Sequence, residues 1–140
     1  MNTKNQYLLL FSGSEWYSRL SAAEIQDVID NSKVWFEKLS SAGKVKASQA
    51  LERSGATISG KSARVISDGP FAETKEAIGG YLLLEADSLE EVIAIAKENP
   101  AVRHGTTIEI RPLTNECPLD YRARQFGCKG QLSELHVATA

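Results

Sequence analysis

Two short apolar runs and two apolar stripes with helical spacing organise this sequence. The runs are residues 7–11 and 81–84, and their length is typical of buried strands. One stripe, which predicts a first helix, comprises Ile25, Val28, Ile29, Trp35, Phe36 and Leu39. The other, which predicts a second helix, comprises Leu89, Val92, Ile93 and Ala96. The chain therefore alternates strands with amphipathic helices.

Residues around the first stripe carry start and stop signals for its helix. Ser21 is a predicted N-cap, and Glu24 completes a capping box three residues later. Gly43 suits the position just after the last turn, where a left-handed backbone is common. Ser32 lies on the apolar stripe and interrupts it. For the second helix, either Asp87 or Ser88 can cap the start, and Asn99-Pro100 ends it.

The remaining strands are weaker in pattern. Residues 45–51 read as one strand, residues 57–58 and 63–66 flank a predicted hairpin turn, and residues 107–111 alternate apolar with polar side chains before Pro112. Without the hairpin, the order is β-α-β-β-α-β. That order predicts an α+β, ferredoxin-like fold with an extra hairpin, in which two helices cover one face of an antiparallel sheet.

The two apolar runs also predict a dimer. A strand with one wet face should alternate apolar and polar residues, but residues 7–11 and 81–84 are apolar on both faces. Two helices can cover only one face, and a large exposed apolar patch is unusual on a monomer. The sequence therefore predicts a homodimer that pairs through its sheet faces. The alternative is that the C-terminal tail covers the second face within one chain.

The last part of the chain lacks a clear period. We expect one domain over residues 1–113 and a C-terminal extension over residues 114–140, which packs on the domain or on a partner. The extension holds Cys117, Cys128 and His136, but no close Cys-x-x-Cys pair, so the pattern is weak evidence for a metal site.

Composition limits the classes of partner. The chain has 42% hydrophobic and 24% charged residues with a net charge of −2. It lacks the basic stripe that would predict nucleic-acid binding. No run approaches the length of a membrane span, and the polar start does not resemble a signal peptide. A cytoplasmic protein is therefore expected. The sequence also lacks a glycine-rich phosphate loop and the common hydrolase and metalloprotease motifs, so no cofactor or metal is expected.

One segment carries a family resemblance. Residues 67–76, Ser-Asp-Gly-Pro-Phe-Ala-Glu-Thr-Lys-Glu, resemble the signature of the DGPF proteins, a branch of the YCII-related family. Residues 77–81, 103–105 and 109–112 extend the resemblance in the same order. It implies a ferredoxin-like, dimeric α+β barrel, but it implies little about activity. Family members are often encoded beside extracytoplasmic-function sigma factors, which suggests a regulatory setting.

Two residues near the signature are candidates for acid–base chemistry. Asp68 can form a turn with the following backbone, or it can act as a base at the mouth of a cleft. His104 precedes the last strand, and histidine is the side chain whose ordinary pKa lies nearest neutral pH. Paired with Asp68, it would form a general acid/base. The structural alternative is a rigid turn at Asp68 and a histidine that only holds its loop in place.

Charged and aromatic residues around this pair are candidate ligand contacts. Phe71, Glu73, Lys75 and Arg103 form this predicted ligand-binding set, and Arg64 and Arg111 could join it. A solvated segment with weak local ion pairs explains the same charges. Gly79-Gly80 predicts a bulge or a close backbone approach as the second apolar run begins.

Two functions fit these patterns. The first is a cofactor-independent enzyme or small-molecule-binding protein, with a pocket near Asp68 and His104 for a small anionic or aromatic compound. The second is a non-catalytic, dimeric interaction or regulatory protein that binds a protein partner, with a sigma factor as one possibility. Convergence of Asp68 and His104 on a cavity would favour the first.

Overall fold

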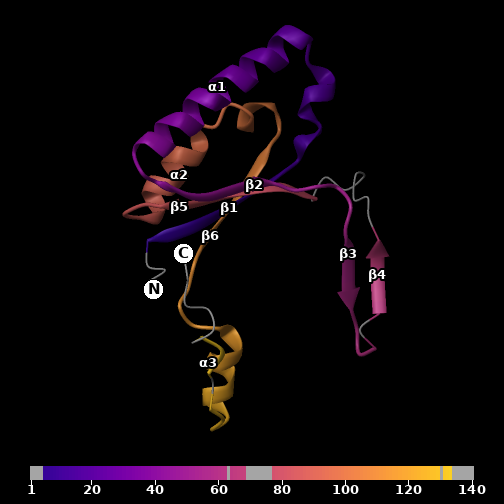
Figure 1. Cartoon of the computed structure of the whole chain (residues 1–140), viewed down its shortest axis with the longest axis vertical. Coiled ribbons are helices and arrows are strands. Elements are labelled where there is room, and N and C mark those ends of the chain that lie inside the picture. Colours follow the sequence, from indigo (N-terminus) through magenta and orange to yellow (C-terminus); the bar gives the residue numbers. More distant parts are fainter. Residues whose placement is uncertain (1–4, 63, 69–76, 130, 134–140) are drawn as a thin grey trace.

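The fold is an antiparallel sheet with helices on one face. The computed structural model describes residues 5–62, 64–68, 77–129 and 131–133. The sheet contains β1 (Gln6–Ser12), β2 (Val45–Ala50), β5 (Ile78–Glu85) and β6 (Thr107–Pro112), in the order β2-β5-β1-β6. The helices α1 (Ala22–Ser41) and α2 (Leu89–Lys97) lie side by side over it (Figure 1). This order and these connections confirm the predicted α+β, ferredoxin-like arrangement.

The core lies between the sheet and these two helices. Alternate residues of β1 and β5 face the helices, because successive side chains of a strand point to opposite faces. Leu9 and Leu84 are 0% exposed and Leu82 is 2% exposed. They pack in one cluster with residues of the helices, among them Leu39 of α1 and Val92 of α2.

Local signals place α1 as the sequence predicts. Ser21 is the N-cap: its hydroxyl accepts a hydrogen bond from the Glu24 N–H at 3.2 Å, and its own N–H donates to Glu24 Oε1 at 3.1 Å. This backbone hydrogen bond from Ser21 is the main cause that holds the pKa of Glu24 below its usual value. At the other end, Gly43 has a φ of 72°, so the predicted capping box and helix stop are both confirmed.

Further contacts join α1 to α2 and to the sheet. The Trp35 indole Nε1 donates a hydrogen bond to the Ile95 carbonyl at 3.0 Å. Lys44 just before β2 forms an ion pair with Glu91 in the first turn of α2. The apolar stripe of α1 is wider than its buried face, since Ile29 and Phe36 remain 42% and 37% exposed.

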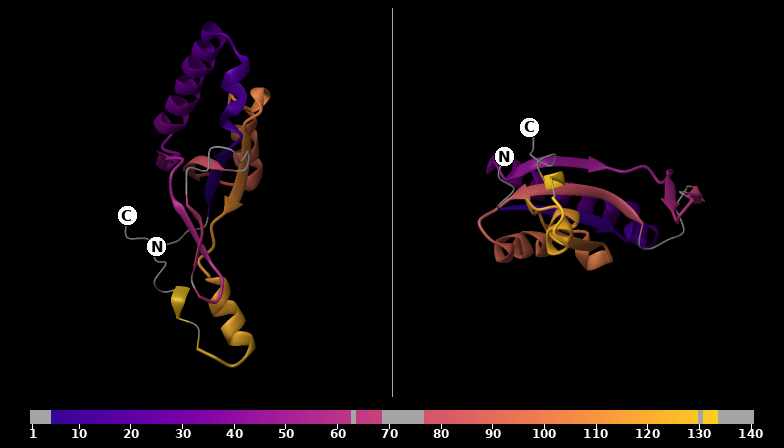
Figure 2. Two further views of the ribbon diagram at one scale, coloured as in Figure 1. Left: turned by 90° about the vertical axis from the view of Figure 1, so that its right-hand side faces the viewer. Right: turned by 90° about the horizontal axis from the view of Figure 1, so that it is seen from below.

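Two parts of the chain project from the opposite side of the sheet. The predicted hairpin is confirmed as a separate ribbon of β3 (Ala56–Ser59) and β4 (Arg64–Asp68). The C-terminal extension contains a helix, α3 (Pro118–Gln125), which the irregular apolar pattern did not predict. Both stand on the side of the sheet away from α1 and α2, as Figures 1 and 2 show from different directions. Among the described residues, no helix is long and apolar enough to cross a membrane.

The sheet has a second apolar face with no helix upon it. Leu8 is paired with Leu83, and Leu10 with Tyr81, on neighbouring positions of β1 and β5. These four side chains are half-buried and point away from the core residues Leu9 and Leu82. Ala47 of β2 extends the row beside Leu83, while Glu109 and Arg111 of β6 form an ion pair at its edge. We call Leu8, Leu10, Ala47, Tyr81 and Leu83 the open sheet face.

The ion pair of Lys44 and Glu91 makes stability depend on pH. The hydrogen bond from the Lys44 ammonium lowers the pKa of the Glu91 carboxyl. A second hydrogen bond, from the Asp87 N–H, lowers this pKa further. A depressed carboxyl pKa stabilises the fold above the ordinary glutamate range, and this stabilisation is lost as the pH falls through the folded-state pKa. Glu91→Gln should therefore lower Tm at neutral pH by no more than a few degrees, because the pair is partly exposed.

Thermal unfolding across the acid range checks this pH dependence. The difference in Tm between wild type and Glu91→Gln should disappear as the pH drops below the ordinary glutamate range. Glu90→Gln, on the exposed neighbouring position, is the matched control and should follow the wild type. A difference in Tm that persists in acid would exclude the ion pair as its cause.

Candidate functional site

A cavity of about 710 Å³ lies at one end of the sheet. It is found where the last residues of β1 and β2 meet the first residues of β5, and it reaches α1 and the connection from α2 to β6. We call it the sheet-end cavity. Its apolar walls include Phe11, Ala50, Leu51, Ile78 and Tyr81. Its polar rim includes Ser12, Glu15, Ser32, Ser48, Gln49, Glu52, Arg53, Thr57, Asn99 and Thr106.

Ser32 explains why there is space beneath α1. It lies on the apolar stripe between the buried residues Val28 and Leu39, and it is half-buried. A large apolar side chain at this position would fill the space above the end of β1. The short serine side chain instead lines the cavity and adds a hydroxyl to its wall. The interruption that the sequence shows in the stripe therefore coincides with a wall of the cavity.

The glycine pair at the start of β5 shapes the opposite wall. The register between β1 and β5 shifts here, since Phe11 pairs with Gly80 and Ser12 with Ile78, which leaves Gly79 as the extra residue. Gly80 is buried, and a Cβ there would lie 3.1 Å from the Gln49 carbonyl oxygen. Both outcomes predicted for this pair are therefore present: a bulge at Gly79 and a close backbone approach at Gly80.

The short 3-10 helix η1 (Ser14–Arg19) borders the mouth of the cavity. The Tyr17 hydroxyl of η1 accepts a hydrogen bond from Arg53 Nη2 at 3.4 Å, which links η1 to the segment after β2. Among the described lining residues, Arg53 supplies the cationic group, while Glu15 and Glu52 supply carboxylates.

Most residues of the predicted site near the signature segment lie outside the described residues. Asp68 is the last residue of β4, and only its backbone belongs to the described part. Phe71, Glu73 and Lys75 fall within residues 69–76, which are not described. Ala77, which directly follows this segment, lines the sheet-end cavity. The residue that follows the signature segment therefore lies at the cavity wall.

The predicted residues Arg103 and His104 lie in the 3-10 helix η2 (Val102–His104). The His104 ring stacks on Trp16 at a centroid distance of 5.7 Å and an interplanar angle of 26°. The His104 carbonyl accepts a hydrogen bond from Arg19 Nη2 at 3.3 Å. Arg103 is exposed. The described ring contact of His104 is therefore with η1, and its pairing with Asp68 stays a prediction.

Neighbours of η2 do reach the cavity. Ala101 and Thr106 on either side of it line the wall, and Asn99 holds the start of this turn, since its Oδ1 accepts from the Ala101 N–H at 2.9 Å. Sequence reasoning selected His104 by its titration range and missed the cavity residues from β1, β2 and α1. Ser32 carried the one usable signal, because it breaks an otherwise apolar stripe.

Comparison with known proteins identifies relatives. Residues 10–115 match the family model described as the YCII-related domain. An uncharacterised protein of Rhizobium meliloti (strain 1021) is 40% identical over 50 residues, which span 35% of this chain and 40% of that protein. Among solved structures, 5-chloro-2-hydroxyhydroquinone dehydrochlorinase (TftG) from Burkholderia phenoliruptrix AC1100, in complex with 2,5-dihydroxybenzoquinone, aligns with a TM-score of 0.43 and 17% identity. That alignment covers 78% of this chain and 93% of the dehydrochlorinase.

Proposed function

This chain belongs to the YCII-related domain family, and we propose that it is a small-molecule-binding protein whose ligand occupies the sheet-end cavity. The observation that carries the proposal is the cavity itself. Its volume of about 710 Å³ falls within the range of roughly 300–1,000 Å³ that is usual for ligand sites. Its apolar walls and polar rim have the character of such sites.

The lining residues indicate the ligand class. Phe11 offers aromatic surface, Ser32 and Asn99 offer hydrogen bonds, and Arg53 offers a positive charge. Aromatic rings favour offset or edge contacts with another ring, and a guanidinium favours a carboxylate. A small aromatic compound with an acidic group satisfies all three kinds of contact.

Acid–base chemistry on this ligand is a further part of the proposal. Asp68 and His104 would act as the acid/base pair, with Phe71, Glu73, Lys75 and Arg103 as ligand contacts. Two observations support a position of these residues near the cavity. Ala77, directly after the signature segment, lines the cavity, and η2 lies between two lining residues. Catalysis requires that the carboxylate and imidazole approach within about 3 Å, directly or through one water.

Filling the cavity at Ser32 should separate ligand binding from stability. In Ser32→Leu the new side chain extends the apolar stripe of α1 into the cavity. We expect a free energy of unfolding equal to or higher than that of the wild type by about 1 kcal/mol, with loss of ligand binding. Small aromatic carboxylates such as benzoate and salicylate serve as probes, followed through backbone amide chemical shifts.

The expected shifts in the wild type gather on Ser12, Gly80, Tyr81 and Asn99. Ser40→Leu, an exposed position on the same helix, is the matched control and should bind the probes normally. Shifts that are scattered over the surface, or that are unchanged in Ser32→Leu, would count against the sheet-end cavity as the binding site.

We also infer that the protein is a homodimer joined through the open sheet face. The chain exposes 9998 Å², whereas a compact monomer of 15.3 kDa exposes about 7,000 Å². The excess of roughly 3,000 Å² for one chain exceeds the roughly 1,000–2,500 Å² that each partner buries in many permanent dimers, and it includes the surface of the projecting hairpin and C-terminal arm. The apolar centre of the face, with the charged Glu109 and Arg111 at its edge, has the usual layout of such interfaces.

A further inference from the structure

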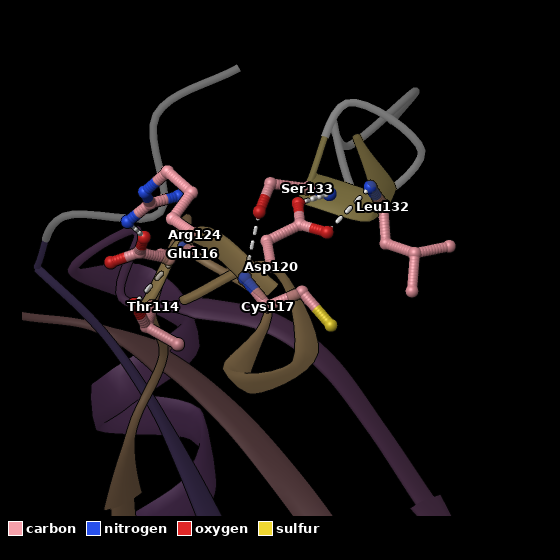
Figure 3. Close-up of polar contacts among 7 residues, drawn as sticks. All are labelled: Thr114, Glu116, Cys117, Asp120, Arg124, Leu132 and Ser133. Carbon is pink, nitrogen blue, oxygen red and sulfur yellow. Dashed lines mark hydrogen bonds and ion pairs between the residues drawn. The ribbon is translucent and has the colours of Figure 1, made fainter. Parts of the chain in front are cut away.

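The C-terminal arm, residues 113–129 and 131–133, is folded although it stands away from the sheet. It leaves the sheet beside β1, where the Leu113 N–H donates to the Gln6 carbonyl at 3.0 Å. Asp120 of α3 is 3% exposed. Its carboxylate accepts hydrogen bonds from the N–H groups of Leu132 at 2.8 Å and Ser133 at 2.5 Å, which Figure 3 shows.

Two further contacts stabilise the fold of the arm. The Ser133 hydroxyl accepts a hydrogen bond from the Cys117 N–H at 2.8 Å, and Glu116 forms an ion pair with Arg124 (Figure 3). Hydrogen bonds to a buried carboxylate are among the stronger ones, at about 1.5–3 kcal/mol each. The arm is therefore pre-organised, which lowers the entropy that it would lose on binding.

The arm presents apolar side chains to the solvent. Leu119 is 66% exposed, Tyr121 54% and Phe126 69%. Leu119 lies in the first turn of α3, and Phe126 is the C-cap residue directly after the helix, seven positions later. The Arg122 guanidinium lies 4.7 Å from the centre of the Phe126 ring. An aromatic ring with an arginine beside it is the composition of many binding hot spots.

The arm extends past the open sheet face. Figures 1 and 2 show α3 on the side of the sheet opposite α1 and α2, standing beyond the open sheet face. A second copy seated on that face would lie alongside α3. In a two-fold dimer each arm then reaches the other copy, because an isologous interface repeats every contact.

We propose that the C-terminal arm packs against a second copy of this chain and clasps the dimer through Leu119 and Phe126. The inference rests on the dimer proposed above and adds a second, separate contact to it. The excess surface of the chain is large enough for both contacts. The arm lies almost wholly beyond residues 10–115, the part that matches the family model, so the clasp is a feature of this chain's extension.

The double variant L119S/F126S tests the clasp by its effect on dimer affinity. Both side chains are exposed in the single chain, so the fold should be retained, as circular dichroism would verify. We expect the dimer Kd, measured by sedimentation of the full chain, to rise about tenfold or more. Val34→Ser is the matched control, since Val34 is 64% exposed on α1, and its Kd should equal that of the wild type.

A second measurement does not depend on affinity. With the photo-crosslinking residue p-benzoylphenylalanine in place of Phe126, irradiation should join two copies of the chain, and the same residue in place of Val34 should not. A stable dimer with an unchanged Kd in L119S/F126S and no crosslink from position 126 would overturn the clasp alone. A wild-type chain that is monomeric at micromolar concentration would overturn both the clasp and the dimer.

Discussion

Leu83→Glu should convert the proposed dimer into a monomer. Leu83 lies at the centre of the open sheet face, between Leu8 of β1 and Ala47 of β2. In the single chain a glutamate there can reach water, because this side chain is half-buried and points away from the core. In a dimer it would be buried without a partner, close to its symmetry-related copy, and both effects cost several kcal/mol. We expect the dimer Kd to rise about a thousandfold, equivalent to ~4 kcal/mol.

Sedimentation velocity at micromolar concentration measures this change directly. Ile93→Glu is the matched control, since Ile93 is a 37% exposed apolar residue of α2 on the other side of the sheet, and this variant should remain dimeric. If Leu83→Glu stays a dimer with the wild-type Kd, the copies do not pair through the open sheet face. If both variants dissociate, a general effect of added charge is the better explanation.

Gly13→Ala should produce the largest loss of stability among single changes at the described glycines. Gly13 follows β1 with a φ of 70°, a conformation that costs other residues about 1–2 kcal/mol. A Cβ at this position would also lie 2.9 Å from the Gly105 carbonyl oxygen, and 3.8 Å from the Thr107 nitrogen, at the start of β6. The backbone would have to move, and overpacking typically costs a further 1–3 kcal/mol. We expect a total loss of about 2–5 kcal/mol in the free energy of unfolding.

Gly43→Ala separates the two causes. Gly43 has nearly the same φ, 72°, but a Cβ there meets nothing within 4 Å. Its loss should therefore stay near 1 kcal/mol, the cost of the backbone conformation alone. Denaturant unfolding of both variants gives the comparison. Equal losses in the free energy of unfolding would show that the contact with the Gly105 carbonyl does not contribute to the effect of Gly13→Ala. Gly13 also lines the sheet-end cavity, so probe binding should weaken in Gly13→Ala alone.

Several features were predictable because their causes are local. The capping box of Ser21 and Glu24 joins residues three positions apart, and the cap of α2 at Ser88 follows the same rule. The bulge and close approach at Gly79 and Gly80 were anticipated from the residue type alone. The apolar runs indicated their strands because every residue in them was suited to burial.

The candidate site was less predictable. Sequence reasoning chose His104 for its titration range, but its ring stacks on Trp16 of η1, a contact between residues 88 positions apart that no local pattern encodes. The cavity residues Phe11, Ser48 and Ile78 come from three strands. They become neighbours only after the sheet forms. Similarly, α3 carries no long apolar stripe, because it is held by Asp120 and Ser133 rather than by burial of one face.

The sequence by itself determined the order along the chain of the strands and of the first two α-helices, the helix that begins after Ser21 and the presence of two apolar faces on β1 and β5. These follow from side-chain chemistry and from spacings of a few residues. Only the tertiary structure decided the strand order β2-β5-β1-β6, the cavity beneath Ser32 and the direction of the C-terminal arm. Each depends on which distant segments pair and in what register, and register is set by packing across the whole sheet.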